Sequence, residues 1–305
     1  MSGMTLGKRR RLQQASGASG AFTVLAVDHR GPLRRRLAKE CAAETVDGVL
    51  AEVKRDIVRT LGAGGTAILL DPELGLAACV ESGALSGSTG LLIALDTGST
   101  GDPAILKTGL AEGWSVRRIA RSGAAGVKLL VYYHPDTAQA REVEALVTEV
   151  GAACAEEEIP LFLEPLSYDP ASPAVPLPTA ERERVVVETA RRLTPLGADI
   201  LKAEFPVHAA ENPDEGHWRR ACEAVTAASC VPWVLLSAGV SDDVFLRQAR
   251  VACEAGSSGV MAGRSVWNEA VTADATARRS FLAGVAWDRL RALREICDRW
   301  GRPVV

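Results

Sequence analysis

The chain alternates short, almost uniformly apolar runs with longer stretches of mixed polarity. Eight such runs, each four to six residues long, follow one another in this order: Phe22–Val27, Thr66–Leu70, Leu91–Leu95, Gly126–Val131, Pro160–Leu163, Asp199–Ala203, Pro232–Leu236 and Gly259–Ala262. Apolar residues at nearly every position of a run are typical of parallel strands buried on both faces. The pattern therefore predicts eight buried parallel strands.

The stretches between these runs have the spacing of amphipathic helices. Val143, Leu146, Val147 and Val150 recur every three or four residues, which places them on one helix face. Helical character extends over these five stretches: Thr45–Leu61, Thr137–Glu157, Thr179–Leu193, Glu215–Ser229 and Asp242–Ala255.

Eightfold alternation of strand and helix predicts an α/β fold, a single (β/α)₈ TIM barrel over residues 1–305. We expect a helical lead-in over residues 1–20 and an additional C-terminal helix over residues 276–300. A doubly wound open sheet is the alternative. That fold usually carries a glycine-rich phosphate motif after its first strand, whereas here the first run ends in Asp28-His-Arg-Gly31.

Composition narrows the class of protein. The 305 residues are 47% hydrophobic and 24% charged, with a net charge of -3, which argues against a nucleic-acid or membrane partner. The basic run Lys8–Arg11 is interpreted as a solvated helix face. No apolar stretch has the length of a membrane span, no signal-peptide pattern is present, and the seven cysteines form no C-x-x-C pair. These features predict a cytoplasmic protein with reduced thiols.

The histidines bear on metal chemistry. The four histidines, at positions 29, 134, 208 and 217, show no metal-ligand spacing. We therefore expect no metal and no cofactor.

Polar residues mark the ends of the predicted strands, where barrel enzymes carry their catalytic groups. They are Asp28, Asp71, Asp96, Lys128, Glu164, Lys202 with Glu204, Ser237 and Gly263 with Arg264. Only six of the 35 basic residues are lysines, yet Lys128 and Lys202 both lie inside apolar runs. A buried lysine can lose its proton and become a nucleophile, which an arginine cannot. The alternative is a pair of lysines held only by ion pairs to Asp28, Glu164 or Glu204.

Two further groups complete a candidate active site. Glu164 follows the strand next to that of Lys202, so it can serve as a proton shuttle or as an ion-pair partner. Ser237-Ala238-Gly239 and Gly263-Arg264 follow the seventh and eighth strands, the usual phosphate-binding position of a barrel.

Seven segments, in order along nearly the whole chain, resemble the tagatose-1,6-bisphosphate aldolase family, which also contains the sulfofructose-1-phosphate aldolases. The segments are Leu25–Gly31, Leu69–Gly75, Val127–Tyr133, Phe162–Asp169, Asp199–Val207, Leu236–Val240 and Gly259–Trp267. The resemblance implies that Lys202 forms the Schiff base, Glu164 is the acid/base, and Asp28 and Lys128 contact the substrate. It also implies an anion site at Ser237, Gly239, Gly263 and Arg264, no metal, and dihydroxyacetone phosphate as a product.

The chain departs from this family at one position and mixes its two branches. His29 stands where most members carry glutamine, which changes a donor near the substrate and can add a pH-dependent group. Asp71–Gly75 and Tyr132-Tyr133 look like the tagatose branch, whereas Phe245–Trp267 looks like the sulfosugar branch. We expect His29 and the strand-eight region to influence the choice between phosphate and sulfonate at C6.

The favoured function is that of a class I aldolase acting on tagatose 1,6-bisphosphate, and 6-deoxy-6-sulfofructose 1-phosphate is the alternative substrate. A non-catalytic, sugar-phosphate-binding regulatory barrel and a deoxyribose-phosphate lyase are rival functions. We expect a homo-oligomer, and Trp287 and Trp300 fit an interface or the core equally well.

Overall fold

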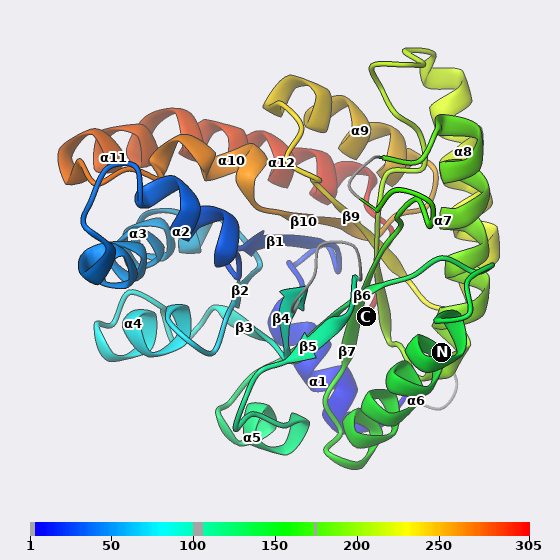
Figure 1. Cartoon of the computed structure of the whole chain (residues 1–305), viewed down its shortest axis with the longest axis horizontal. Helices are drawn as coiled ribbons and strands as arrows, with labels where there is room; N and C mark the ends of the chain where they lie inside the picture. The colour runs from blue at the N-terminus through cyan, green and yellow to red at the C-terminus, as the bar shows by residue number, and fades with distance from the viewer. Residues whose placement is uncertain (1–3, 100–105, 174–175) are drawn as a thin grey trace.

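Eight parallel strands close into a barrel in this computed structural model, which describes residues 4–99, 106–173 and 176–305. Around the barrel the order is β1-β10-β9-β8-β7-β6-β3-β2 (Figure 1). The strands are β1 Phe22–Ala26, β2 Ala67–Leu70, β3 Gly90–Ala94, β6 Gly126–Tyr132, β7 Leu161–Leu166, β8 Ile200–Ala203, β9 Trp233–Leu236 and β10 Gly259–Ala262. All eight predicted strands are present, and the predicted TIM barrel is confirmed.

Helices surround the barrel (Figure 1), and all but the first of them lie outside its wall. They are α1 Leu6–Ala15, α2 Gly31–Leu37, α3 Val46–Leu61, α4 Gly75–Glu81, α5 Val116–Arg121, α6 Ala140–Glu156, α7 Thr179–Leu193, α8 Glu215–Ala228, α9 Asp242–Glu254, α10 Arg264–Trp267, α11 Ala275–Phe281 and α12 Trp287–Trp300. The additional C-terminal helices of the predicted fold are α11 and α12. Trp287 and Trp300 are partly buried and pack against the core. No helix in the described ranges is long and apolar enough to cross a membrane.

Alternate residues of each strand face opposite sides of the barrel wall, because side chains along a strand have a period of two. In β1, Val24 belongs to the apolar cluster inside the barrel, whereas Leu25 belongs to the cluster between strands and helices. The interior series Phe22, Val24 and Ala26 leads to position 28 at the mouth. The two-residue alternation of side chains therefore determines which residue beyond each strand faces into the open, carboxyl end of the barrel.

Helix α1 packs against the interior cluster through Leu12 and Ala15. The ammonium of Lys8 lies 2.7 Å from Asp199, whose carboxylate also accepts a hydrogen bond from the backbone N–H of Leu161. Lys8 thus ties α1 to the start of β8 and β7. The prediction of a solvated basic face over Lys8–Arg11 is wrong for Lys8, which is buried in this ion pair.

A small antiparallel hairpin, which the sequence pattern did not predict, follows β3. Its strands are β4 Asp96–Ser99 and β5 Thr108–Leu110, with a register irregularity between Asp96 and Gly98. The segment Asp-Thr-Gly-Ser has no apolar alternation, so it carries no strand signal. The hairpin begins at Asp96, shortly after β3 ends at Ala94.

Candidate active site

A cavity of about 520 Å³ opens at the carboxyl ends of the barrel strands. Its walls include all ten of the site residues that the sequence singled out: Asp28, His29, Lys128, Glu164, Lys202, Ser237, Ala238, Gly239, Gly263 and Arg264. The fold therefore brings together residues that are up to 236 positions apart (28 to 264).

Three carboxylates surround the ammonium of Lys128. Its Nζ lies 3.0 Å from Asp28 Oδ2, 3.1 Å from Asp96 Oδ1 and 2.8 Å from Glu164 Oε2. The Lys128 side chain is only 2% exposed, so these contacts act with little screening by water. Lys128 is therefore held as a cation in a nearly closed carboxylate cage.

Lys202 has a different environment. Its Nζ lies 2.7 Å from Glu164 Oε1, the second oxygen of the carboxylate that also contacts Lys128. No other carboxylate in the described ranges lies within ion-pair distance of Lys202. Glu164 is thus shared by the two lysines, one oxygen to each.

The charged state of this cluster follows from burial and charge together. Burial favours the neutral carboxyl at Asp28 and Glu164, but the charges of Lys128 and Lys202 outweigh burial and lower the pKa of both acids. Burial also disfavours a charged Lys128, yet Asp28, Asp96 and Glu164 raise its pKa well above the ordinary lysine value. Lys128 therefore remains an ammonium over the physiological pH range.

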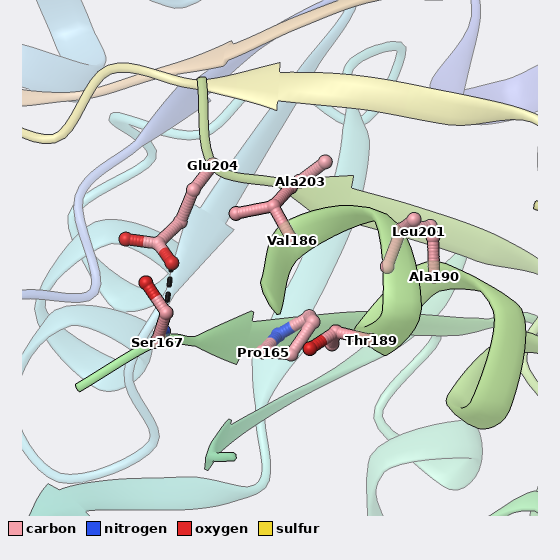
Figure 2. Close-up of a pocket in the computed structure, with 8 residues that line it drawn as sticks. All are labelled: Pro165, Ser167, Val186, Thr189, Ala190, Leu201, Ala203 and Glu204. Carbon is pink, nitrogen blue, oxygen red and sulfur yellow. Dashed lines mark hydrogen bonds between the residues drawn. The ribbon is translucent and has the colours of Figure 1, made fainter. Parts of the chain in front are cut away.

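Glu204 does not hold either lysine, contrary to one of the alternatives from the sequence. Its carboxylate accepts a hydrogen bond of 2.7 Å from the backbone N–H of Ser167 (Figure 2). It accepts a second hydrogen bond, of 3.0 Å, from Arg182. These contacts lie beside a cavity of about 10 Å³ between α7 and strands β7 and β8, roughly the volume of one water molecule. Glu204 thus fixes the ends of two strands relative to each other.

A third buried lysine supports the first strand from outside the barrel. Lys54 of α3 forms a fully buried ion pair with Asp71 and donates a 3.0 Å hydrogen bond to the carbonyl of Val27. Asp71 also accepts hydrogen bonds from the backbone N–H groups of Leu74 and Gly75. Because Val27 precedes Asp28, this pair fixes the backbone next to the cavity.

The predicted phosphate segments lie together on one side of the cavity. Ala238 and Gly239 both have left-handed backbone conformations, with φ of 48° and 77°. A Cβ at Gly239 would lie 3.3 Å from the guanidinium carbon of Arg264, so glycine lets that group approach the loop closely. Arg264 forms no ion pair with a carboxylate in the described part of the chain, and its Nε is buried without a partner there. This side of the cavity therefore places the Arg264 guanidinium, with no carboxylate partner in the described ranges, beside the backbone amides of the Ala238-Gly239 turn.

His29 lies on this same side, between β1 and β10. Its ring meets that of Trp267 edge-on at 5.4 Å, and a Cβ at Gly263 would lie 2.9 Å from its Cε1. Burial lowers the pKa of His29 to about 4, aided by the charge of Arg264 and opposed by Asp28. The imidazole is therefore neutral at pH 7, and it lies beside Gly263 and the predicted phosphate segments.

Asp96 and Arg30 belong to the cavity wall, and the sequence did not assign either of them to the site. The sequence marks Asp96 as a polar residue at the end of the third apolar run and gives it no role in the site. Leu92 and Ala94 face into the barrel, so the strand period places residue 96 there as well. That period was the available signal. Arg30, also missed, joins Asp96 to the neighbouring loop through contacts with Glu73 and the Asp96 carbonyl.

Among the residues that the structure describes, no group of three His, Cys, Asp or Glu side chains is arranged to hold a metal ion.

Comparison with known proteins places this geometry in a family. Residues 22–269 match the family model described as DeoC/LacD family aldolase. The chain is 33% identical over 283 residues to a tagatose 1,6-diphosphate aldolase of Staphylococcus aureus strain JH9, covering 85% of this chain and 84% of that one. The same values hold for the enzyme of strain Newman.

Solved structures share the fold at low sequence identity. An archaeal fructose-1,6-bisphosphate aldolase, with its catalytic lysine bound to a carbinolamine intermediate, matches with a TM-score of 0.62 and 19% identity over 95% of this chain and 99% of that one. A Plasmodium falciparum fructose-bisphosphate aldolase matches with a TM-score of 0.77 and 14% identity, over 99% and 97% of the two chains. These matches agree with the closed barrel described above.

Proposed function

Because the chain belongs to the DeoC/LacD family of aldolases and is a class I aldehyde-lyase, we propose that it cleaves a 6-substituted ketohexose 1-phosphate through an imine on Lys202. The favoured substrate is tagatose 1,6-bisphosphate, which yields dihydroxyacetone phosphate and a three-carbon aldehyde phosphate. The identity to the S. aureus tagatose enzymes supports this choice over 6-deoxy-6-sulfofructose 1-phosphate.

The unequal surroundings of the two cavity lysines carry the proposal. Lys128 is fixed as an ammonium by three carboxylates, so it cannot act as the nucleophile. Glu164 is the one carboxylate within ion-pair distance of Lys202 in the described ranges, at 2.7 Å, so the Lys202 amine has no carboxylate cage of the kind that surrounds Lys128. One lysine therefore serves as the amine and the other as a permanent cation.

The chemistry follows from these positions. The amine of Lys202 adds to the C2 carbonyl, and Glu164 returns a proton to the departing hydroxyl, so that water leaves and the iminium forms. The C4 hydroxyl then gives its proton to Glu164, and the C3–C4 bond breaks. The electron pair of that bond moves into the iminium and gives the enamine. Lys128 stabilises the C4 oxygen as its negative charge develops.

The side of the cavity formed by Ser237, Gly239 and Arg264 is proposed to bind the 1-phosphate. The observation in favour is the cavity-facing guanidinium with no carboxylate partner in the described ranges, next to a turn of two left-handed residues. Charge-assisted hydrogen bonds from a guanidinium and from backbone amides suit a phosphate. We include Asp28, His29, Ala238 and Gly263 among the substrate contacts.

Borohydride trapping with dihydroxyacetone phosphate tests the mechanism. Reduction should fix a mass adduct on Lys202, located by peptide mapping, and K202M should give none. K107M is the matched control, because Lys107 is an exposed lysine paired with Glu142, and it should trap like the wild type. An adduct on Lys128, or none on Lys202, would overturn the proposal.

Substrate choice requires a separate comparison. Cleavage rates of tagatose 1,6-bisphosphate, fructose 1,6-bisphosphate and sulfofructose 1-phosphate should rank the tagatose substrate first. Equal rates on the two bisphosphates would show that C4 stereochemistry is not selected. A strong preference for the sulfonate would replace the favoured substrate, and acetaldehyde release from deoxyribose 5-phosphate would point to the deoxyribose-phosphate lyase instead.

A further inference from the structure

We propose that Asp96 is a positioning residue that keeps Lys128 charged and in place while Glu164 changes its own charge during the reaction. This inference rests on the proposed function, because it concerns the cleavage step at the same site. It goes further by giving the three carboxylates around Lys128 different roles.

Asp96 is held rigidly by groups that do not take part in the chemistry. Its Oδ1 accepts a 2.8 Å hydrogen bond from the backbone N–H of Leu130, and its Oδ2 accepts one of 3.2 Å from the backbone N–H of Gly98. The guanidinium of Arg30 lies 3.7 Å from Oδ2. Asp96 is only 1% exposed. These fixed donors hold the carboxylate in one orientation.

The other two carboxylates around Lys128 have further tasks. Glu164 is shared with Lys202 and becomes neutral whenever it carries a proton. Asp28 lies 3.7 Å from His29 Nδ1 and is 7% exposed at the cavity wall, where substrate enters. Asp96 forms no ion pair with Lys202, so it has no direct charged contact with the amine that is proposed to form the imine.

The consequence concerns the moment at which Glu164 accepts the proton of the C4 hydroxyl. Lys128 then loses one of its three counter-ions while a negative charge develops on the C4 oxygen. Asp96, at 3.1 Å and 3.3 Å from Nζ through its two oxygens, still holds the ammonium in place. Without it, Lys128 would be shared between Asp28 and the substrate alone, and its position would be less defined.

D96N tests this role, because asparagine keeps the shape and one acceptor but removes the charge. We expect borohydride trapping of dihydroxyacetone phosphate on Lys202 to stay within about twofold of wild type, while kcat for cleavage falls about 10- to 100-fold. With one carboxylate fewer, the pKa of Lys128 falls, so the alkaline limb of kcat should move to lower pH. D199N is the matched control, because it removes a carboxylate from the ion pair with Lys8 at the other end of β8. It should not shift the alkaline limb of the kcat profile.

The outcomes separate the possible roles. A parallel loss of trapping and cleavage with an unmoved pH limb would mean that Asp96 is merely structural and would overturn the proposal, as would unchanged kcat. If D96N does not fold, D96E is the second variant, because it keeps the carboxylate on a side chain that is longer by one methylene group. D96E should lower kcat without shifting the alkaline limb of the pH profile. A wild-type kcat in D96E would overturn the proposal. Failure of the wild type itself to trap on Lys202 would refute the proposed function, which is a separate result.

Discussion

Glu164 lies 2.7 Å from the amine of Lys202, and its second oxygen contacts a different lysine. In the mechanism proposed above, this one carboxylate serves both the imine steps and the cleavage step. In E164Q we expect kcat to fall about 10²- to 10⁴-fold, the usual range for loss of a general acid–base group. Single-turnover measurements should show that imine formation and cleavage both slow down. E183Q, which changes a glutamate paired with His217 away from the cavity, is the control; loss of only one of the two steps in E164Q would contradict the shared role.

Arg264 should contribute binding energy to the 1-phosphate. A hydrogen bond to a charged group is worth about 1.5–3 kcal/mol, so R264M should raise KM about 10- to 100-fold for a ketose 1-phosphate. The same variant should have little effect on slow cleavage of a ketose without that phosphate, because the lost contact is absent there. R118M, on the distant helix α5, is the control. Equal losses on both substrates would show that Arg264 acts elsewhere.

His29 should make the stability of the fold depend on pH. Its pKa in the folded chain is about 4, below the ordinary value of 6.5. As the pH falls from about 6.5 to about 4, His29 takes up a proton in the unfolded chain but not in the folded chain. The free energy of unfolding therefore decreases over this pH range. At about pH 4.5 the contribution is on the order of 2 kcal/mol relative to pH 7.

Urea unfolding of wild type and H29Q at these two pH values measures the effect. H29Q should lose less stability on acidification, since the remaining loss comes from carboxylates such as Asp28 whose pKa values are lowered in the fold. Identical losses in the two proteins would exclude His29 as the source.

Lys54 should be essential to stability because it neutralises Asp71 inside the protein. K54M leaves a buried, unpaired carboxylate and should lower the free energy of unfolding by about 3–5 kcal/mol. K54M/D71N removes both charges and should recover much of this loss, while the side-chain amide oxygen that D71N introduces can still accept the backbone hydrogen bonds of Leu74 and Gly75. Denaturant unfolding gives both values. A double variant as unstable as K54M would mean that the hydrogen bond to Val27, rather than the charge balance, dominates.

The sequence was informative wherever local pattern and chemistry coincide. Apolar runs predicted all eight barrel strands, and an arginine-rich composition made Lys128 and Lys202 conspicuous. The cage around Lys128 was not foreseen in full, because the role of Asp96 depends on strand direction and on Arg30, which are tertiary features. For Glu204 the sequence was misleading. Its position near Lys202 in the sequence suggested an ion pair with a lysine, but its carboxylate contacts Arg182 and Ser167.

The hairpin of β4 and β5 starts at Asp96, so a residue of the charge cluster and a segment above the barrel are one continuous piece of backbone. Loops at this end of a barrel are the usual place where new specificity arises, since they vary without disturbing the core. In this protein the first residue of the segment, Asp96, also contacts Lys128, so that position is less free to vary. If Asp96 holds Lys128 as proposed, exchange of this segment between relatives should preserve the full cleavage rate only when the graft retains a carboxylate at its first position.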